Sequence, residues 1–433
     1  MPIAAQERLI RPARNVRGSL RLPGDKSISH RYAMLAAFAE GTSRFINFSS
    51  GADCASTLAC MQALGAKVTR TGGSSVEIEG VSGRVTPATH PLDCGNSGST
   101  MRMMAGLLAA QEGRFVLVGD ASLSRRPMER IRKPLEAMGA HLTLTDGHAP
   151  LTIDGGPLHA IDYTTPVPSA QVKTCILLAG LQTAGITTVQ EAVRTRDHSE
   201  LALRAFGATL IRTANSVSIC GPQNLHGIEG AVPGDISSAA FFLCAAALFP
   251  GSNLVLSSLG LNPTRAVLLD VLTALGAHVA ILNIEETHSE LAGTVQVKAP
   301  PEGMSGTEVS GALASQIIDE LPVLAAIAPF TRDGIRIRDA RELRVKESDR
   351  IALVAKNLRA MGADVTEFDD GLDVPGGQSL HGATIDSGGD HRIGMAFSVA
   401  ALRAQGETLI QGADSAAISF PEFFDLLDLI AER

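Results

Sequence analysis

The chain repeats one sequence unit six times, and this repetition limits the possible folds more than any other feature. In each copy an Ala- and Leu-rich segment ends at a Gly that precedes a short β-type run. In five copies the next helical segment ends in Leu, Met or Phe followed by Gly-Ala. Each unit therefore reads strand, helix, strand, helix, strand, usually with one more short strand. The first set of glycines is Gly41, Gly113, Gly185, Gly251, Gly334 and Gly406, and the second is Gly65, Gly139, Gly207, Gly276 and Gly362.

The two halves of the chain also match each other. Pro23-Gly24-Asp25 has a counterpart in Pro233-Gly234-Asp235, three units further along. We therefore predict an α/β fold with two similar domains, each of three βαβαββ units, and an active site in the cleft between the domains. The expected N-terminal domain is 23–234. The expected C-terminal domain is 1–22 plus 235–433, because the first strand would join the second domain.

Composition excludes several classes of protein. A chain of 433 residues with 45% hydrophobic residues has ample material for two cores. The longest apolar run, 239–249, is too short to span a bilayer, and the N-terminus does not resemble a secretory signal. A net charge of −8 and the absence of a basic run argue against nucleic acid. The six scattered cysteines favour a reducing cytoplasm and argue against a metal site or a disulfide framework.

A cationic segment, 24–31, follows the first predicted domain boundary. Gly24, Lys26, Ser27 and Arg31 stand at the start of an apolar helix, where free N–H groups and the helix dipole favour an anion. The alternative is an ordinary helix start with Ser27 as its N-cap and the cations in solvent. The second domain keeps the turn but has Ile236 in place of Lys26.

The same phase of other units also carries polar and cationic residues. The small residues 95–99 form either an anion-binding backbone nest or a plain N-cap. Arg126 is either a ligand or a solvated residue before a helix. Ser169 and Gln171 suit sugar-like hydroxyls, although an N-cap explains Ser169 almost as well. Arg196 opens a charged helix start. If the units superpose, these helix starts point the same way.

Carboxylates accompany the cations in the fifth and sixth units. Lys346, Glu347 and Arg350 have the spacing of one helix face, which is typical of a surface ion-pair helix or of an acid–base group between cations. Asp319 lies in an apolar context, where a carboxylate is costly unless it is paired or used. Arg392, after two glycines, suits a phosphate or a carboxylate. This set predicts transfer chemistry between two small anions, run by electrostatics and acid–base groups without a cofactor or metal.

These residues resemble the 3-phosphoshikimate 1-carboxyvinyltransferase (EPSP synthase) family of the shikimate pathway, which leads to chorismate and the aromatic amino acids. The resemblance runs from about residue 20 to 424, and the six-unit plan matches that family's two domains. The segments 169–173, 196–200 and 262–265 resemble its class II branch. The matching motifs are residues 22–31, Gly95-Asn96-Ser97-Gly98, 344–350 and Asp390-His391-Arg392.

The resemblance implies the reaction and its residues. Phosphoenolpyruvate and shikimate 3-phosphate bind, the 5-hydroxyl attacks C2 while C3 is protonated, and phosphate then leaves. The implied catalytic residues are Asp319, Glu347 and Lys26. Those implied to bind shikimate 3-phosphate are Lys26, Ser27, Arg31, Ser169, Ala170, Gln171, Arg196, Asp319 and Lys346. Those implied to bind phosphoenolpyruvate are Lys26, Asn96, Gly98, Arg126, Gln171, Arg350 and Arg392.

Some positions depart from the class I pattern of the family. Ile418 stands where a C-terminal Lys contacts phosphoenolpyruvate, Ala170 where a second Ser follows Ser169, and Ser99 where Thr is common. Arg196 takes the role of a Tyr. Gly98 leaves room beside phosphoenolpyruvate and so predicts sensitivity to glyphosate.

Two rival functions fit the sequence less well. UDP-N-acetylglucosamine enolpyruvyl transferase shares the plan, but its Ala-Lys-Asn type motif is replaced here by Asp25-Lys26-Ser27, and 119–127 lacks its loop Cys. A catalytically dead scaffold of the same fold would not need every proposed charged residue. We expect a cytoplasmic monomer whose partners are the two small substrates, with no nucleic acid and no membrane.

Overall fold

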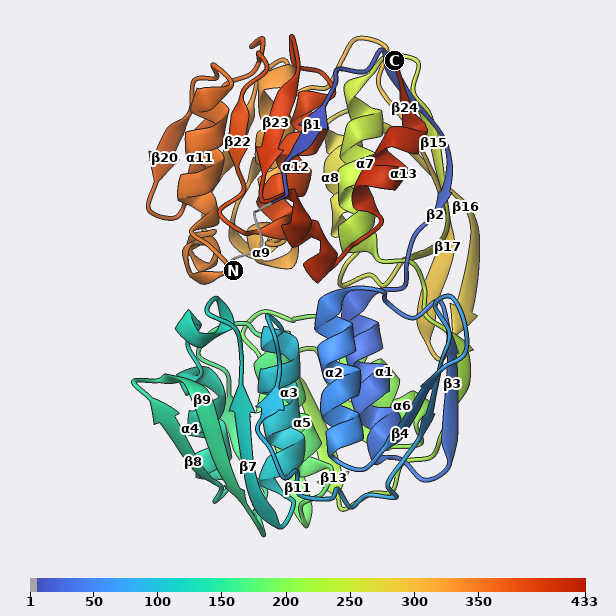
Figure 1. Cartoon of the computed structure of the whole chain (residues 1–433), viewed down its shortest axis with the longest axis vertical. Coiled ribbons are helices and arrows are strands. Elements are labelled where there is room, and N and C mark those ends of the chain that lie inside the picture. The colour runs from blue at the N-terminus through green and yellow to red at the C-terminus, as the bar shows by residue number, and fades with distance from the viewer. Residues whose placement is uncertain (1–5) are drawn as a thin grey trace. The chain divides into compact units, whose positions relative to one another are not determined.

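A computed structural model describes residues 6–433 of the chain (Figure 1). The chain separates into two compact units. The N-terminal unit comprises Gly24–Val232 with Glu286–Glu290, and the C-terminal unit comprises the chain up to Pro23, Pro233–Glu285 and Leu291–Arg433. The predicted domain limits, 23–234 and 1–22 plus 235–433, remain our proposal, and residues 1–5 lie outside the described part.

The N-terminal unit contains the first three repeats. The first holds α1 (Lys26–Phe38), β3 (Thr42–Ile46), α2 (Ala52–Ala63), β4 (Lys67–Arg70) and β5 (Val76–Glu79). The second holds β6 (Leu92–Asp93), α3 (Gly98–Ala109), β7 (Gly113–Val118), η1 (Leu123–Arg125), α4 (Glu129–Ala137), β8 (His141–Thr145) and β9 (His148–Gly155). The third holds β10 (Asp162–Thr164), α5 (Ala170–Gly180), β11 (Gly185–Gln190), α6 (His198–Ala205), β12 (Leu210–Arg212) and β13 (Ser216–Gly221), followed by β14 (Glu229–Ala231).

The C-terminal unit begins with β1 (Arg8–Ile10) and β2 (Asn15–Arg21) and contains the last three repeats. The fourth holds α7 (Ile236–Leu248), β15 (Asn253–Gly260), α8 (Val267–Ala274), β16 (His278–Thr287) and β17 (Glu290–Lys298). The fifth holds β18 (Thr307–Val309), α9 (Gly311–Gln316), α10 (Leu321–Ile327), η2 (Ala328–Phe330), β19 (Ile335–Ile337), η3 (Arg341–Val345), α11 (Arg350–Ala360), β20 (Thr366–Phe368) and β21 (Gly371–Val374). The sixth holds β22 (Thr384–Asp386), α12 (His391–Ala401), β23 (Thr408–Gln411), η4 (Ala413–Ile418), α13 (Phe423–Ile430) and β24 (Ala431–Glu432).

Each repeat forms its own small sheet with a recurring strand order. In the second repeat β6 pairs in parallel with β7, β7 pairs antiparallel with β9, and β9 pairs antiparallel with β8. The third and fifth repeats have the same order, β10-β11-β13-β12 and β18-β19-β21-β20. The sixth repeat lacks the hairpin, and β1 pairs antiparallel with β23 in its place. The predicted α/β fold of six repeats is confirmed.

Two strands are supplied from outside the sequence of their own repeat. The first repeat obtains its first strand from β14, which lies near the end of 24–232 and pairs in parallel with β3. The fourth repeat obtains its first strand from β2, near the start of the chain, which pairs in parallel with β15. The chain therefore leaves the C-terminal unit between Pro23 and Gly24 and returns to it between Val232 and Pro233.

The marker glycines explain why the repeat is visible in the sequence. All eleven have positive φ, between 83° and 132°. In this region a side chain is strained and Gly is not, so Gly is the residue that ends each helix and starts each following strand.

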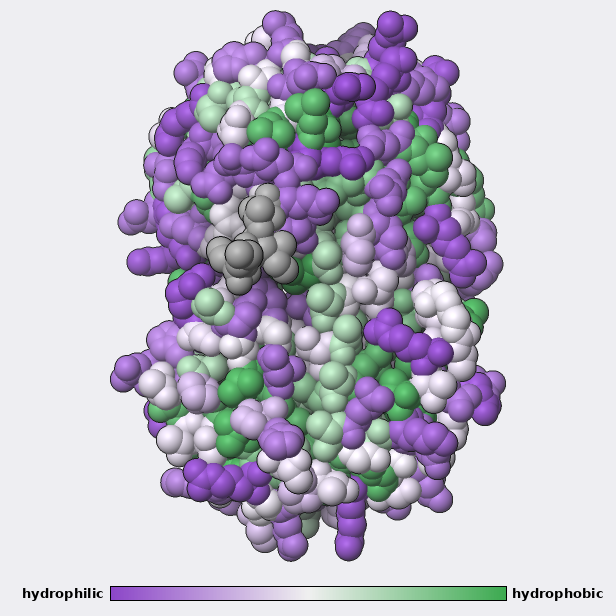
Figure 2. Space-filling model, viewed as in Figure 1, coloured by the Kyte–Doolittle hydropathy of each residue, from purple (hydrophilic) through white to green (hydrophobic). Residues whose placement is uncertain are grey.

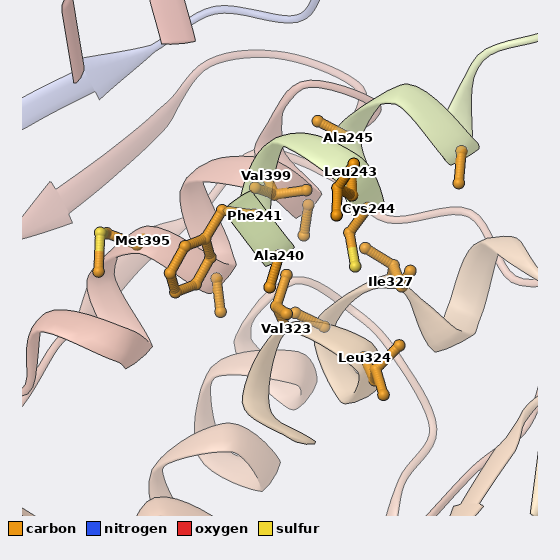
Figure 3. Close-up of a cluster of buried hydrophobic side chains, with 14 of the residues drawn as sticks. Ala240, Phe241, Leu243, Cys244, Ala245, Val323, Leu324, Ile327, Met395 and Val399 are labelled. Carbon is orange, nitrogen blue, oxygen red and sulfur yellow. The ribbon is translucent and has the colours of Figure 1, made fainter. Parts of the chain in front are cut away.

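The first helix of each repeat is largely buried at the centre of its unit, and in the fifth repeat α10 takes this place while most of α9 is not buried. All 13 residues of α7 are buried, so this helix is apolar on every side. Helices α7, α10 and α12 pack together through the residues shown in Figure 3, including Phe241, Leu324 and Val399. In the N-terminal unit α3 lies close against α5, because a Cβ at Gly106 would meet the carbonyl oxygen of Cys175 at 1.9 Å. Figure 2 shows the complementary surface, where hydrophilic residues predominate and hydrophobic ones form small groups.

Two local readings of helix starts are wrong, and the fifth repeat adds an interruption that was not predicted. Helix α1 is capped by Asp25, not Ser27, since the Asp25 carboxylate accepts from the Ile28 N–H at 2.9 Å. Helix α11 begins at Arg350 because Asp349 caps it, so Lys346 and Glu347 precede the helix and share no helical face with Arg350. The fifth repeat's first helix is split into α9 and α10, and Asp319 lies in the interruption. Pro322 near the start of α10 fits a new helix start.

Candidate functional site

Lys26, the first residue of helix α1, forms an ion pair with a buried carboxylate. Lys26 Nζ lies 3.0 Å from Asp53 Oδ2, in the first turn of α2. Because the Asp25 carboxylate caps the helix by accepting from the Ile28 N–H, Ser27 is not needed as a cap. The structure thus leaves Lys26 and Ser27 at a helix N-terminus, in a position that suits an anion.

Arg31 is held one turn further along α1. Its Nε donates to Ser199 Oγ at 2.6 Å, one terminal nitrogen donates to the Ser27 carbonyl at 2.8 Å and the other to Thr174 Oγ1 at 3.1 Å. Burial lowers the pKa of Arg31 to about 10, against the opposing effect of Glu200, and the nearby charge of Arg196 lowers it further. The helices α1, α5 and α6 therefore meet at one guanidinium.

The start of α3 forms a second polar group in the N-terminal unit. Ser97 caps the helix, accepting from the Thr100 N–H. A Cβ on Gly98 would lie 2.9 Å from an Arg102 terminal nitrogen and 3.4 Å from one of Arg126. Arg126 donates to Asn96 Oδ1 at 2.6 Å. Gly98 is thus enclosed by two guanidinium groups.

Gln171 links this group to helix α5. Its amide oxygen accepts from Arg102 at 2.8 Å, and its amide nitrogen donates to Ser99 Oγ at 2.9 Å. Ser169 caps α5 by accepting from the Val172 N–H, which agrees with the alternative reading of that residue. Ala170 is the first residue of α5, and Arg196 lies two residues before α6.

In the C-terminal unit, Asp319 forms ion pairs with two cations. Its Oδ1 lies 3.5 Å from Lys346 Nζ and 3.4 Å from an Arg350 terminal nitrogen. Arg350 also contacts Glu347 Oε2 at 2.6 Å. The four residues converge although they do not share a helix face, because the segment before α11 folds back on the interruption between α9 and α10.

Asp390 at the start of α12 completes the surroundings of Arg350. Its carboxylate accepts from Arg350 Nε at 2.8 Å and from Ser348 Oγ at 2.9 Å. Burial opposes both charges, but the mutual attraction outweighs it: Asp390, Glu347 and Asp319 raise the pKa of Arg350 above its ordinary value, and Arg350 holds the pKa of Asp390 below its ordinary value.

Arg392 joins the same cluster from the next residues of α12. One terminal nitrogen donates to the Asp319 carbonyl at 2.8 Å and the other to Ser237 Oγ at 2.9 Å. Ser237 in turn donates to Glu320, whose carboxylate is 3.7 Å from the buried Arg265. The C-terminal unit therefore gathers three candidate cations, Lys346, Arg350 and Arg392, with the carboxylates Asp319 and Glu347.

Comparison with known proteins decides the family. The model of the family "EPSP synthase (3-phosphoshikimate 1-carboxyvinyltransferase)" matches residues 10–427. This chain belongs to the EPSP synthase family. A relative from Koribacter versatilis, named 3-phosphoshikimate 1-carboxyvinyltransferase, is 63% identical over 98% of this chain and 99% of its own length. One from Solibacter usitatus with the same name is 53% identical over 98% of this chain and its whole length.

Solved EPSP synthase structures share the fold as well as the sequence. EPSP synthase from Acinetobacter baumannii superposes with a TM-score of 0.87 at 39% identity, covering 98% of each chain. The resemblance noted in the sequence is thus confirmed for the family and the fold. Among residues 6–433 of this family member, no helix combines the length and apolar character that crossing a bilayer requires.

Sequence reasoning missed several residues of these clusters. Arg102 was not among the predicted site residues, although its place one helical turn after Gly98 was a usable signal. Asp53 and Ser237 carry no local pattern that points to Lys26 and Arg392. Asp390 was quoted only as part of a motif, and its pairing with Arg350 spans 40 residues.

Proposed function

We propose that this chain catalyses the 3-phosphoshikimate 1-carboxyvinyltransferase reaction. It transfers the enolpyruvyl group of phosphoenolpyruvate to the 5-hydroxyl of shikimate 3-phosphate, giving 5-enolpyruvylshikimate 3-phosphate and phosphate. Full-length identity to relatives of that name carries this proposal. The chemistry of the residues supports it, because two substrates with several negative charges need many cations.

We assign shikimate 3-phosphate to residues of both units. Lys26, Ser27 and Arg31 on α1 and Lys346 in the C-terminal unit supply donors for its phosphate and hydroxyls. Ser169, Ala170, Gln171 and Arg196 complete this set. For phosphoenolpyruvate we propose Lys26 and Gln171 again, together with Asn96, Gly98, Arg126, Arg350 and Arg392. These assignments are supported by the donor groups that each residue presents.

The proton transfers fall to two carboxylates. Asp319, which pairs with Lys346 and Arg350, takes the proton of the 5-hydroxyl as the hydroxyl oxygen attacks C2. Glu347, paired with Arg350, delivers a proton to C3. The tetrahedral adduct then loses phosphate as the C3 proton is removed and the enol ether double bond re-forms. Lys26 stabilises negative charge on both substrates.

A coupled phosphate-release assay tests this function. We expect release from phosphoenolpyruvate when shikimate 3-phosphate is added and no release when UDP-N-acetylglucosamine replaces it. Release with UDP-N-acetylglucosamine alone would assign the chain to the rival transferase. No release with either acceptor from folded protein would favour a binding scaffold. We also expect a cytoplasmic monomer that needs no added metal.

Gly98→Ala tests the phosphoenolpyruvate assignment. The new methyl group would press on Arg102 at 2.9 Å, and Arg102 is held by Gln171. We expect the KM for phosphoenolpyruvate to rise about tenfold and inhibition by glyphosate to weaken at least as much, since one tight contact costs on the order of 1–2 kcal/mol. Steady-state kinetics with glyphosate titrations measure both. Wild-type insensitivity to high glyphosate would contradict the assignment.

Glu347→Gln tests the proposed proton donor. The amide keeps the size of the side chain but cannot supply an acidic proton, so we expect kcat to fall about 100-fold, the lower range for a lost general acid. Binding of both substrates, measured by calorimetry, should change far less. Near-normal turnover would show that Glu347 is not the donor.

A further inference from the structure

A buried ion-pair cluster around Lys173 joins α5, α6 and the segment after β11. Lys173 Nζ lies 2.9 Å from Glu191 Oε2 and 2.9 Å from Glu200 Oε1. The Lys173 side chain is 1% exposed, and both carboxylates are buried. A buried ammonium or carboxylate is costly when it stands alone, so each of the three charges depends on the others. None of them is among the proposed substrate contacts.

The cluster adjoins Arg31 through its neighbours in sequence. Ser199, next to Glu200, accepts from Arg31 Nε at 2.6 Å, and Thr174, next to Lys173, accepts from its terminal nitrogen at 3.1 Å. Thr174 and Ser199 also hydrogen-bond each other. Glu200 and Arg31 also interact electrostatically. Burial lowers the pKa of Arg31, and the negative charge of Glu200 raises it by a smaller amount. The guanidinium and the cluster are therefore one electrostatic system.

Lys173 is the ion-pair partner of both buried carboxylates, while the charges of Arg196, Asp25 and Glu290 also act on Arg31. Lys173 and Arg31 supply two positive charges, and Glu191 and Glu200 supply two negative ones. Without Lys173, the two buried carboxylates lose the ammonium group that pairs with both of them. Glu200 directly follows Ser199, which accepts from Arg31, so a Glu200 carboxylate without Lys173 would compete for the Arg31 guanidinium.

We infer that Lys173 is a positioning residue for the substrate phosphate or hydroxyl held by Arg31: it occupies the Glu200 carboxylate and so keeps the Arg31 guanidinium available to shikimate 3-phosphate. This inference rests on the proposed function. It assigns to Lys173 a role in affinity for one substrate, exerted through Glu200.

The test compares binding of shikimate 3-phosphate by titration calorimetry in the full-length wild type and three variants. Lys173→Met removes the charge and keeps the length, and we expect the Kd to rise about tenfold. Adding Glu200→Gln removes the carboxylate that captures Arg31, so Lys173→Met/Glu200→Gln should recover most of the affinity. Lys356→Met, which breaks an exposed pair with Asp386, is the control and should bind like the wild type.

A purely structural role gives a different pattern. It predicts that the double variant, with more of the cluster removed, binds no better than Lys173→Met, and that result would overturn the inference. If Lys173→Met does not fold, Glu200→Gln alone decides: unchanged or tighter binding supports the role, and about tenfold weaker binding refutes it. Failure of the wild type to turn over shikimate 3-phosphate would refute the proposed function itself, whereas wild-type turnover with unchanged Lys173→Met affinity refutes only this inference.

Discussion

Replacing Asp319 by Ala is expected to lower kcat by about 1,000-fold, within the range of 10²–10⁴ for a lost general base. The carboxylate oxygen is the acceptor that Lys346 and Arg350 hold in place at 3.5 and 3.4 Å. Without it, the 5-hydroxyl of shikimate 3-phosphate has no group to take its proton. Removal of a negative charge beside two cations does not weaken binding of anions, so KM for phosphoenolpyruvate should stay constant or fall.

Steady-state kinetics and single-turnover experiments separate the two effects. Asp154→Asn on β9, an exposed carboxylate paired with Arg114, is the control and should retain wild-type kcat. A loss of kcat in Asp319→Ala that is matched by an equal loss of substrate affinity would contradict the assignment. Near-normal turnover in Asp319→Ala would remove the residue from the mechanism.

Replacing Arg350 by Met is expected to cost about 3–5 kcal/mol in the free energy of unfolding, the usual effect of removing one partner of a buried ion pair. Arg350 is 1% exposed, and its guanidinium contacts three carboxylates: Asp319, Glu347 and the fully buried Asp390. The variant leaves the Asp390 carboxylate without its guanidinium partner, although the Ser348 hydroxyl and the Arg392 backbone N–H still donate to it and His391 lies next to it in sequence. Activity should be lost as well, since Arg350 is a proposed phosphoenolpyruvate ligand.

Urea denaturation followed by circular dichroism measures this loss of stability. Arg336→Met is the matched control, because Arg336 pairs with Asp373 on an exposed sheet surface. Such exposed pairs contribute about 0–1 kcal/mol, so the control should unfold near the wild-type midpoint. Equal destabilisation by the two substitutions would show that the buried cluster does not stabilise the C-terminal unit.

The repeat architecture was predictable from the sequence because its markers act locally. A Gly with positive φ, such as Gly65 or Gly139, ends its helix whatever the rest of the chain does. Asp319 was also identifiable, because a carboxylate in an apolar segment needs a partner or a purpose. The helix starts were less certain, since several residues near each start compete for the same N–H groups. The residues that cap α1 and α11 are Asp25 and Asp349.

Pairings between distant residues were not predictable. Lys173 meets Glu191 and Glu200 through contacts that span 18 and 27 residues, and Arg350 meets Asp390 across 40. Nothing in the local pattern distinguishes these residues from charges on a solvated surface. The folding of the third repeat brings Lys173, Glu191 and Glu200 together, and the contact between α11 of the fifth repeat and α12 of the sixth brings Arg350 to Asp390. The role of these residues therefore emerges from the tertiary structure.

The exchange of β2 and β14 affects the order in which the two units become complete during synthesis. All of Gly24–Val232, with β14, has been made before the ribosome reaches the fourth repeat. The C-terminal unit is different, because β2 lies between β15 and β24 in its sheet although it is made first. Strand β2 therefore has no partner strand until more than half of the chain has been synthesised. Many proteins tolerate the removal of N-terminal residues. Truncation of this chain up to residue 23 should instead destabilise the C-terminal unit, whose core includes Val16, Leu20 and Leu22.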